Sequence, residues 1–391
     1  MPSNGGLEYG VLRDDEVEGA IALLCQAFHS SAERQRQMFD HLGAASFRVV
    51  RRRGAEIAGG LRIIPMGQWF GGARVPAAGI SSVAVAPEHR GAGAASTLLR
   101  CALQEIHDEK TPLSILYPTT LTLYRRAGYE LAGVRINYET PLHAMDSPDR
   151  ALAVLRVGPE EHDDLRQAYA RQAMATCGNL DRPAYLWSRI LEPKDQTAYK
   201  YRVRREGQTE AYAVFIQEGW GKPMRVQDLC VLSPEAGRRL LAFFADHRTT
   251  VGSLVWTGGP EDALLHLLPE HKSREVRVGF WMARIVDVAG ALGARAYPQG
   301  LEAELHFEVR DEALPWNNGR FVLEVANGQG QARPGGQGRI RIGIGQLAPL
   351  FTGHLSPWAL RVAGGVEASE ADLAMAGLVF CGPRPWMPDI F

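Results

Sequence analysis

The sequence predicts a mixed α/β (α+β) protein built from three domains. Its 391 residues exceed the usual size of one domain and leave room for two or three. Short segments rich in β-branched residues alternate with amphipathic helical segments, and this order occurs twice before about residue 290. From about residue 291 the pattern changes to paired strands followed by helices. We therefore expect domains at residues 1–145, 146–290 and 291–391.

The composition excludes several classes of protein. With 46% hydrophobic residues, 22% charged residues and a net charge of −1, the chain lacks the basic excess of a nucleic-acid-binding protein. It contains no apolar run of about 18 residues or more and no signal-peptide pattern, so we expect a cytoplasmic protein without a membrane span. The five cysteines are scattered without C-x-x-C spacing, and no H-x-x-x-H pair occurs. We therefore expect reduced thiols and no metal site.

The most informative stretch is residues 80–95, ISSVAVAPEHRGAGAA. Residues 82–86 are rich in β-branched residues and apolar on both faces, which indicates a buried strand. Pro87 ends it because proline cannot donate to the sheet ladder. A glycine-containing turn follows at residues 90–95. The next residues predict a helix to about Asp108 with a single apolar stripe, made of Leu98, Leu99, Ala102, Leu103 and Ile106.

Such a turn at the start of a helix can bind an anion. The first helical N–H groups lack partners, the helix dipole is positive there, and small residues let a phosphate approach the backbone. The spacing fits neither a P-loop nor a dinucleotide fingerprint, and the alternative is a surface turn before an ordinary helix. It resembles the acetyl-CoA loop of the GNAT N-acetyltransferase superfamily, R/Q-x-x-G-x-G/A, with Arg90, Gly93 and Ala95 in place. The resemblance implies acetyl-CoA contacts from Val83, Ala84, Val85, Arg90, Gly91, Ala92, Gly93, Ala94, Ala95 and Thr119.

The remaining elements of the first region follow the order that this superfamily requires. Acidic residues Asp14 and Asp15 can cap a helix whose apolar face ends at Phe28. Strands are expected at residues 8–13, 47–53, 57–65, 113–117 and 129–138, and a short helix at 118–124.

A direct acetyl transfer needs a proton donor for the departing thiolate. The thiolate has a pKa near 8.5, so one phenol close to the sulfur suffices. Tyr124 lies in LYRRAGY, which is similar to the superfamily segment Y-x-R/K-x-G-Y/F, where the first tyrosine is the general acid. The resemblance implies this role for Tyr124. The alternative is an aromatic ring that only packs under the cofactor.

The middle region predicts a second, degenerate copy of the same layout. Helices are expected at residues 159–175, 182–191, 233–247 and 261–268, and strands at 151–157, 199–205, 210–217, 224–231 and 251–257. After the strand that ends near Leu232 comes SPEAGRR, which has one glycine and no cradle for a phosphate. We expect this copy to bind no cofactor and to shape the substrate side.

The last region resembles the sterol-carrier-protein fold. Asp287 can cap a short helix to Arg295, and strands are expected at residues 301–309, 319–325 and 339–344. Residues 328–338 are rich in Gly and Gln and are expected to form a mobile hairpin tip, and helices are expected at 344–351 and 368–376. The end, PRPWMPDIF, combines aromatic residues with prolines, which argues against a floppy polar tail.

The three regions together resemble the Eis (enhanced intracellular survival) family of bacterial N-acetyltransferases. The resemblance rests on the loop at 90–95, on MARIVDV at 282–288, on the PWNNGR turn and on the terminal segment P-x-M-x-D-x-F. It implies a homohexamer that acetylates amines of aminoglycosides or peptide lysines. It also implies that the terminal carboxylate, here that of Phe391, enters the active site as the general base.

An α-carboxyl with a pKa near 3.5 is poorly matched to an alkylammonium near 10. It could act if burial raised its pKa, through a water, or mainly by orienting the amine. The alternative is that the end of the chain docks only as a structural plug and takes no part in the reaction.

The sequence departs from the Eis pattern after Phe28, because His29, Ser30 and Ser31 supply no acid and the nearest acids are Glu33 and Asp40. This puts polycationic substrates in doubt. Phe28, Phe39 and Trp69 are candidates for the wall of the substrate site, although each could instead be a core residue. A competing hypothesis is a non-catalytic scaffold that binds acyl-CoA or lipid through the last domain.

Overall fold

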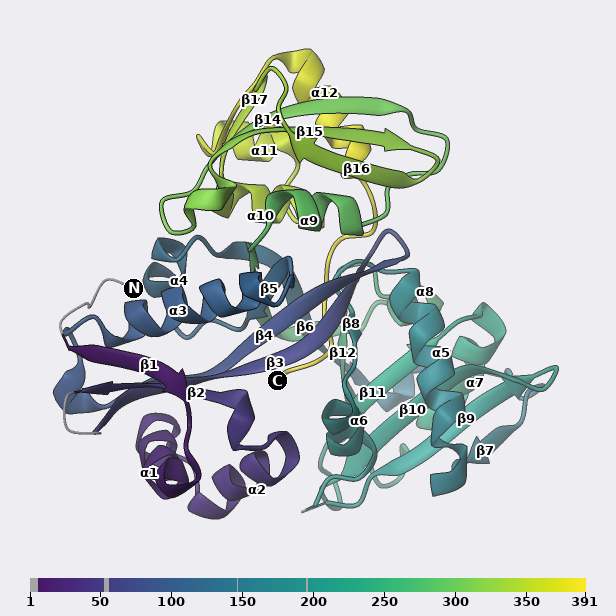
Figure 1. Ribbon diagram of the computed structural model, residues 1–391. Helices are drawn as coiled ribbons and strands as arrows, with labels where there is room; N and C mark the ends of the chain where they lie inside the picture. Colours follow the sequence, from purple (N-terminus) through teal and green to yellow (C-terminus); the bar gives the residue numbers. More distant parts are fainter. Residues whose placement is uncertain (1–5, 53–55, 146, 195) are drawn as a thin grey trace.

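The computed structural model describes residues 6–52, 56–145, 147–194 and 196–391 (Figure 1). The first region confirms the predicted alternation of strands and helices. Its elements are β1 (Leu7–Val11), α1 (Val17–Phe28), α2 (Ala32–Leu42), β2 (Phe47–Arg52), β3 (Ile57–Phe70), β4 (Ala73–Val85), α3 (Ala94–Asp108), β5 (Leu113–Leu116), α4 (Leu121–Arg126) and β6 (Glu130–Pro141).

Two helical layers cover this part of the sheet. The predicted stripe of α3 is fully buried against one face, together with residues of β3 such as Leu61 and Ile63. Helix α1 covers the other face through Ala20, Ile21 and Leu24. The two faces of β3 and β4 are therefore both protected, which explains why residues 82–86 are apolar on both sides.

Several local predictions for the first region were wrong. Asp14 and Asp15 do not cap α1 but belong to a 3₁₀ turn (Asp14–Glu16), in which the Glu16 side chain accepts from the backbone N–H of Arg13. Phe28, at the end of α1, is 42% exposed. The short helix begins at Leu121 rather than 118, and α2 was not predicted because its mean hydropathy is low and its apolar residues are few.

The middle region adds β7 (Val154–Arg156), α5 (His162–Met174), β8 (Leu180–Asp181), α6 (Ala184–Leu191), β9 (Tyr199–Arg205), β10 (Gln208–Gln217), β11 (Met224–Val231), α7 (Pro234–Ala245), β12 (Ser253–Gly258), α8 (Ala263–Leu267) and β13 (Arg274–Ile285). Its strands continue the same sheet instead of forming a separate one. The path is β1-β2-β3-β4-β5-β13-β6-β12-β11-β10-β9-β7, and β8 pairs with β3.

The two regions exchange their last strands at the centre of this sheet. Strand β13 of the middle region lies between β5 and β6 and pairs antiparallel with both. Strand β6 of the first region pairs with β12 of the middle region. Each half is thus completed by a strand from the other, and the segment predicted only as a joint at 282–288 forms the end of β13 and the start of the next helix.

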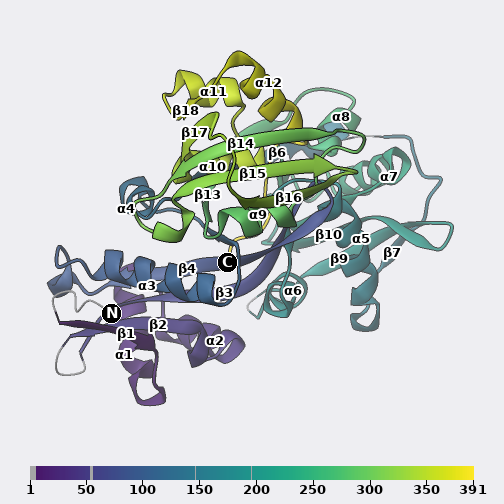
Figure 2. The ribbon, with the colours of Figure 1, turned by 45° about the horizontal axis from the view of Figure 1, so that its top comes forward.

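The last region forms a five-stranded sheet with helices on it (Figure 2). Its elements are α9 (Val288–Ala294), β14 (Ala303–Arg310), β15 (Gly319–Ala326), β16 (Gln329–Pro334), β17 (Ile340–Gly343), α10 (Ile344–Thr352), α11 (Pro357–Val362), β18 (Val366–Glu367) and α12 (Glu370–Val379). The Asp287 cap is confirmed, because its carboxylate accepts from the N–H of Gly290. The mobile tip was wrong: β16 pairs with β15 across a turn in which Asn327 and Gly328 both have positive φ.

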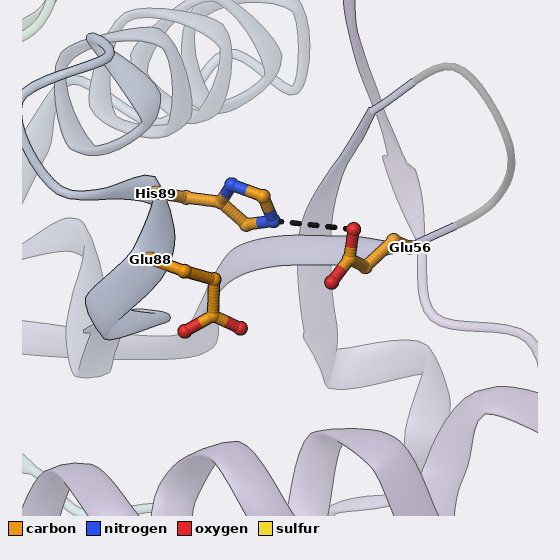
Figure 3. A group of neighbouring side chains, drawn as sticks. All are labelled: Glu56, Glu88 and His89. Carbon is orange, nitrogen blue, oxygen red and sulfur yellow. Dashed lines mark ion pairs between the residues drawn. The ribbon is translucent and has the colours of Figure 1, made fainter.

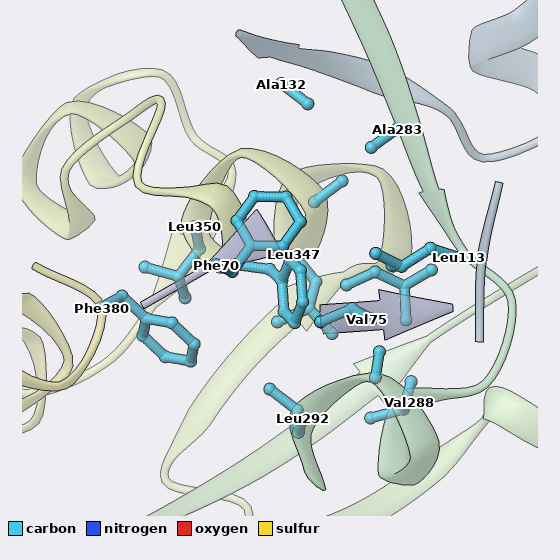
Figure 4. Packing of buried hydrophobic residues seen from close by; sticks show 14 of the residues in the cluster. Phe70, Val75, Leu113, Ala132, Ala283, Val288, Leu292, Leu347, Leu350 and Phe380 are labelled. Carbon is cyan, nitrogen blue, oxygen red and sulfur yellow. The ribbon is translucent and has the colours of Figure 1, made fainter. Parts of the chain in front are cut away.

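The last region shares its core with the first. Leu347 and Leu350 of α10 and Val288 and Leu292 of α9 pack toward Phe70 of β3 and the strands around it (Figure 4). All of these side chains are buried. The C-terminal domain is therefore fixed against the large sheet by an apolar contact, not by a flexible connection.

Candidate active site

The predicted anion loop adopts an open left-handed turn. After β4, residues Pro87–His89 form a 3₁₀ turn, and Gly91 and Gly93 have φ of 79° and 82°. Glycine suits both positions because other L-residues rarely adopt this conformation. A Cβ added at either glycine would meet nothing within 4 Å, so the backbone is open to a ligand. Arg90 to Gly93 are exposed, whereas Ala94 is 2% exposed and anchors α3 in the core.

A cavity of about 500 Å³ lies beside this loop, between α3 and α4. It is lined by Ala92 and Gly93 of the loop and by Ser96 and Arg100 on the exposed side of α3. Arg126 contributes from α4. Two guanidinium groups near an uncapped helix N-terminus favour an anionic ligand. Arg100 and Arg126 were not predicted from the sequence. Arg100 could have been, because it lies one helical turn after Ser96 and two turns after Gly93, on the same side of α3.

Strands β4 and β5 separate next to this loop. They pair in parallel only from Ala77 to Gly79, opposite Leu113 to Ile115. In β4, Ser82 has φ of 54° and the register with β3 shifts, so two residues, Ser82 and Val83, stand opposite one. This bulge was not predicted, and a serine with positive φ inside a strand gives no clear sequence signal.

The other predicted cofactor residues divide between exposed and buried positions. Val83 and Val85 are partly buried and pack against the core under α3. Ala84 is buried and points to the opposite core under α1, so only its backbone can face the cleft. Thr119 is exposed in the loop between β5 and α4, and Ala95 is half-buried in the first turn of α3.

Tyr124 lies on α4 and is 5% exposed. Its ring packs edge-on against Tyr129 at 6.0 Å, and Tyr129 is fixed by a 2.7 Å hydrogen bond to Ser114. Burial raises the pKa of Tyr124 above the ordinary value of a phenol. A phenol held in its protonated form can donate a proton, and the same ring position also serves packing.

The chain terminus lies where β4 and β5 separate. The Phe391 ring packs against Gly79. A Cβ atom built on this glycine would lie only 2.8 Å from the ring and 2.6 Å from the end of Met66. On the β5 side it contacts the Tyr117 ring at 6.0 Å. The Tyr117 hydroxyl donates to the backbone carbonyl of Asp389 at 2.8 Å. The terminal residue thus lies at Gly79, the last residue of β4 that pairs with β5.

The candidate wall residues lie in different environments. Phe39 is a core residue, 7% exposed, with the Arg62 guanidinium 4.5 Å from its ring centre. Trp69 packs partly against the middle domain. Phe28 is the most exposed of the three, and Glu33 is exposed at the start of α2.

The corresponding turn of the middle region is closed. Gly237 is buried in α7, and a Cβ there would lie 2.3 Å from Leu267 and 2.9 Å from Val231. Gly237 therefore serves packing inside α7 and does not form an open turn, which supports the prediction of a degenerate copy.

Three possible metal ligands lie close together (Figure 3): Glu88 and His89 directly precede the anion loop, and Glu56 precedes β3. Their ligating atoms lie within 4.8 Å of one another, and the Nε2 atom of His89 is 3.4 Å from Glu56. Both carboxylates are exposed, and exposed ion pairs contribute little to stability. The contact joins the turn before Arg90 to the start of β3.

Comparison with known proteins places these features in a family. Two family models described as an acetyltransferase (GNAT) domain match residues 8–132 and 178–285, and a sterol carrier protein domain matches residues 288–388. An uncharacterized N-acetyltransferase of Streptomyces griseus is 30% identical over 82% of this chain and 83% of its own. The N-acetyltransferase Eis of Mycobacterium tuberculosis is 26% identical over 92% and 93%.

The fold agrees with these matches. A crystal structure of a GCN5-related N-acetyltransferase from Anabaena variabilis superposes with a TM-score of 0.95 at 38% identity, covering 98% of this chain and 100% of that one. The order of two GNAT-type domains before a sterol carrier protein domain matches the order of the folded regions. The protein is similar to Eis over nearly its whole length, belongs to the GNAT N-acetyltransferases and is an acetyltransferase enzyme.

Proposed function

We propose that the enzyme transfers the acetyl group of acetyl-CoA to a primary amine of a small molecule or a peptide lysine. The observation that carries the proposal is the open glycine turn beside a cavity with two arginines. The turn and the α3 N-terminus suit the pyrophosphate of acetyl-CoA, and Arg100 and Arg126 suit its further phosphate. The gap between β4 and β5 offers backbone groups to the chain that carries the thioester. The ten predicted contacts from Val83 to Thr119 stay part of this proposal.

The chemistry is a direct attack of the amine nitrogen on the acetyl carbonyl carbon. The carbon–sulfur bond breaks, and the thiolate takes a proton from the hydroxyl of Tyr124. Burial raises the pKa of Tyr124, which keeps the phenol protonated and available as a donor but also makes it a weaker acid toward the thiolate. The Phe391 carboxylate takes the amine proton, directly or through a water, or orients the amine.

The acceptor we propose is an amine of modest positive charge. No acid directly follows Phe28, and Glu33 is exposed at the start of α2, so the acceptor side offers few fixed negative charges besides the terminus. A polycation such as an aminoglycoside would gain less from this site than a singly charged amine. A panel of amines of increasing charge ranks this preference directly.

We also propose a homohexamer in the cytoplasm, with domains near 1–145, 146–290 and 291–391. Val276, Val278 and Phe280 alternate along β13 and are each more than 40% exposed, so one face of the strand presents an apolar stripe. Such a stripe suits contact with another copy. No helix in the described part of the chain has the length and apolar character to cross a membrane. Light scattering of the purified enzyme measures the assembly.

The decisive experiment measures thiol release from acetyl-CoA with the amine panel. Amine-dependent release supports the enzyme with acetyl-CoA as donor, whereas binding of acetyl-CoA without release supports the scaffold. A second sample carries a short C-terminal tag, which converts the Phe391 carboxylate into an amide and adds bulk. We expect it to bind acetyl-CoA normally and to lose turnover. Normal turnover of the tagged enzyme would move the base to Glu33, Asp40 or a water.

A further inference from the structure

The last residues of the chain are held by the middle domain through a buried charge cluster. Arg182 precedes α6 and its side chain is fully buried. It makes two hydrogen bonds to Asp228 of β11, at 2.7 and 2.8 Å. Its Nε atom lies 2.9 Å from the carboxylate of Asp389 in the tail, whose side chain is 3% exposed.

The cluster holds more negative charge than it needs. Arg182 and Asp228 already form a neutral bidentate pair, and the Tyr212 hydroxyl donates to Asp228 at 2.5 Å. The Tyr169 hydroxyl is 3.4 Å from Asp389 but donates at shorter range to the carbonyl of Leu180. Burial raises the pKa of Asp389, Arg182 opposes this, and Asp228 adds to it. Burying a third charge costs free energy of desolvation. We therefore looked for a role of Asp389 other than stabilising the pair.

The tail itself shows that purpose. The carbonyl oxygens of Pro388, Asp389 and Ile390 accept from Arg135, Tyr117 and Arg189, at 3.0, 2.8 and 3.2 Å. Of the last four residues, only Asp389 also has a side chain in an ion pair, and it lies two residues before the terminal carboxylate. Two residues span at most about 7 Å, so the position of Asp389 limits where the terminal carboxylate can lie.

We infer that Asp389 is a positioning residue: by pairing with Arg182, it lets the middle domain set the place of the Phe391 carboxylate in the active site of the first domain. The inference rests on the proposed function of that carboxylate. It also gives the degenerate domain a part in the reaction although its own anion loop is closed.

The test compares Asp389→Ala and Asp389→Asn with a control, Asp163→Asn. Asp163 forms a surface ion pair with Arg166 and its side chain is 76% exposed, so the same chemical change there should alter nothing. Both tail variants leave the neutral Arg182–Asp228 pair intact and should fold. We expect kcat to fall about 100-fold in the alanine variant and about tenfold in the asparagine variant, which keeps a hydrogen-bond acceptor. The KM for acetyl-CoA should not change.

A second measurement reports the position of the tail without using activity. Carboxypeptidase A removes an aromatic residue from a free C-terminus, and release of Phe391 from the folded enzyme can be followed by mass. We expect release at least tenfold faster in Asp389→Ala than in the unaltered enzyme or in Asp163→Asn. An unchanged release rate, or faster release with normal kcat, would overturn the inference. The proposed role of the carboxylate fails separately, if the C-terminally tagged enzyme remains active.

Discussion

Replacing Gly79 by alanine tests whether the position of Phe391 controls catalysis. The added methyl group would lie 2.8 Å from the Phe391 ring and 2.6 Å from the end of Met66. The flexible Met66 methyl can rotate away, but the ring must withdraw by about 1 Å to reach an ordinary carbon–carbon separation of about 3.8 Å. A displacement of about 1 Å can cost about 100-fold in rate. We therefore expect kcat to fall about 100-fold, with the KM for acetyl-CoA within about twofold of normal.

The assay is steady-state thiol release with a saturating amine, together with thermal unfolding. Overpacking costs about 1 to 3 kcal/mol, so the variant should melt a few degrees lower and still fold. The matched control is Gly279→Ala on β13, where the new methyl would have only an ordinary contact, 3.8 Å from the carbonyl of Arg135. Normal kcat in Gly79→Ala would refute the reasoning, because the ring would have moved without effect on the reaction.

Three further predictions concern the loop, the proton donor and a partly buried acid. Gly93→Asp and Gly93→Asn place side chains of similar size at the same positive φ. We expect the aspartate variant to bind acetyl-CoA more weakly by calorimetry, because only aspartate repels a phosphate. Equal affinities of the two variants would show that the loop is not the phosphate site. Tyr124→Phe keeps the ring and should lower kcat by about 10²- to 10⁴-fold with unchanged acetyl-CoA binding, and near-normal turnover would leave Tyr124 a packing residue. Burial raises the pKa of Asp262 from 3.8 to about 6, so its contribution to stability is complete below pH 3.8 and is lost as the pH rises through 6. Asp262→Asn keeps the cap on α8. The melting temperature of this variant, relative to that of the unaltered enzyme, should therefore rise between pH 4 and pH 7. A difference in melting temperature that does not change with pH would contradict this.

The sequence allowed the local features of the site to be predicted where one physical requirement dominates. The stripe of α3 follows from helical periodicity, and Gly93 follows from the need for a small residue before a helix that faces an anion. The strand β16 could have been predicted from Asn327-Gly328, a pair typical of tight hairpins, but its polar composition suggested a loop instead.

Features that depend on distant contacts could not be predicted in this way. The bulge at Ser82 is set by the pairing of β4 with β3, and the ion pair of Asp389 joins residues 182 and 389, which no periodicity connects. Arg62 shows the same limit, because a charged residue in β3 predicts an exposed position, yet it is fully buried beside Phe39.

The exchanged strands have a consequence for how the chain is made and how it can change. During synthesis, β5 obtains its neighbour β13 only after residue 285 has left the ribosome, so the first half must wait with an open sheet edge. Such non-local pairing slows folding and favours one cooperative unit over two independent modules. A deletion of the middle region would remove β13 from beside β5, at the point where the active-site cleft opens. The first half therefore needs the middle half to complete its sheet.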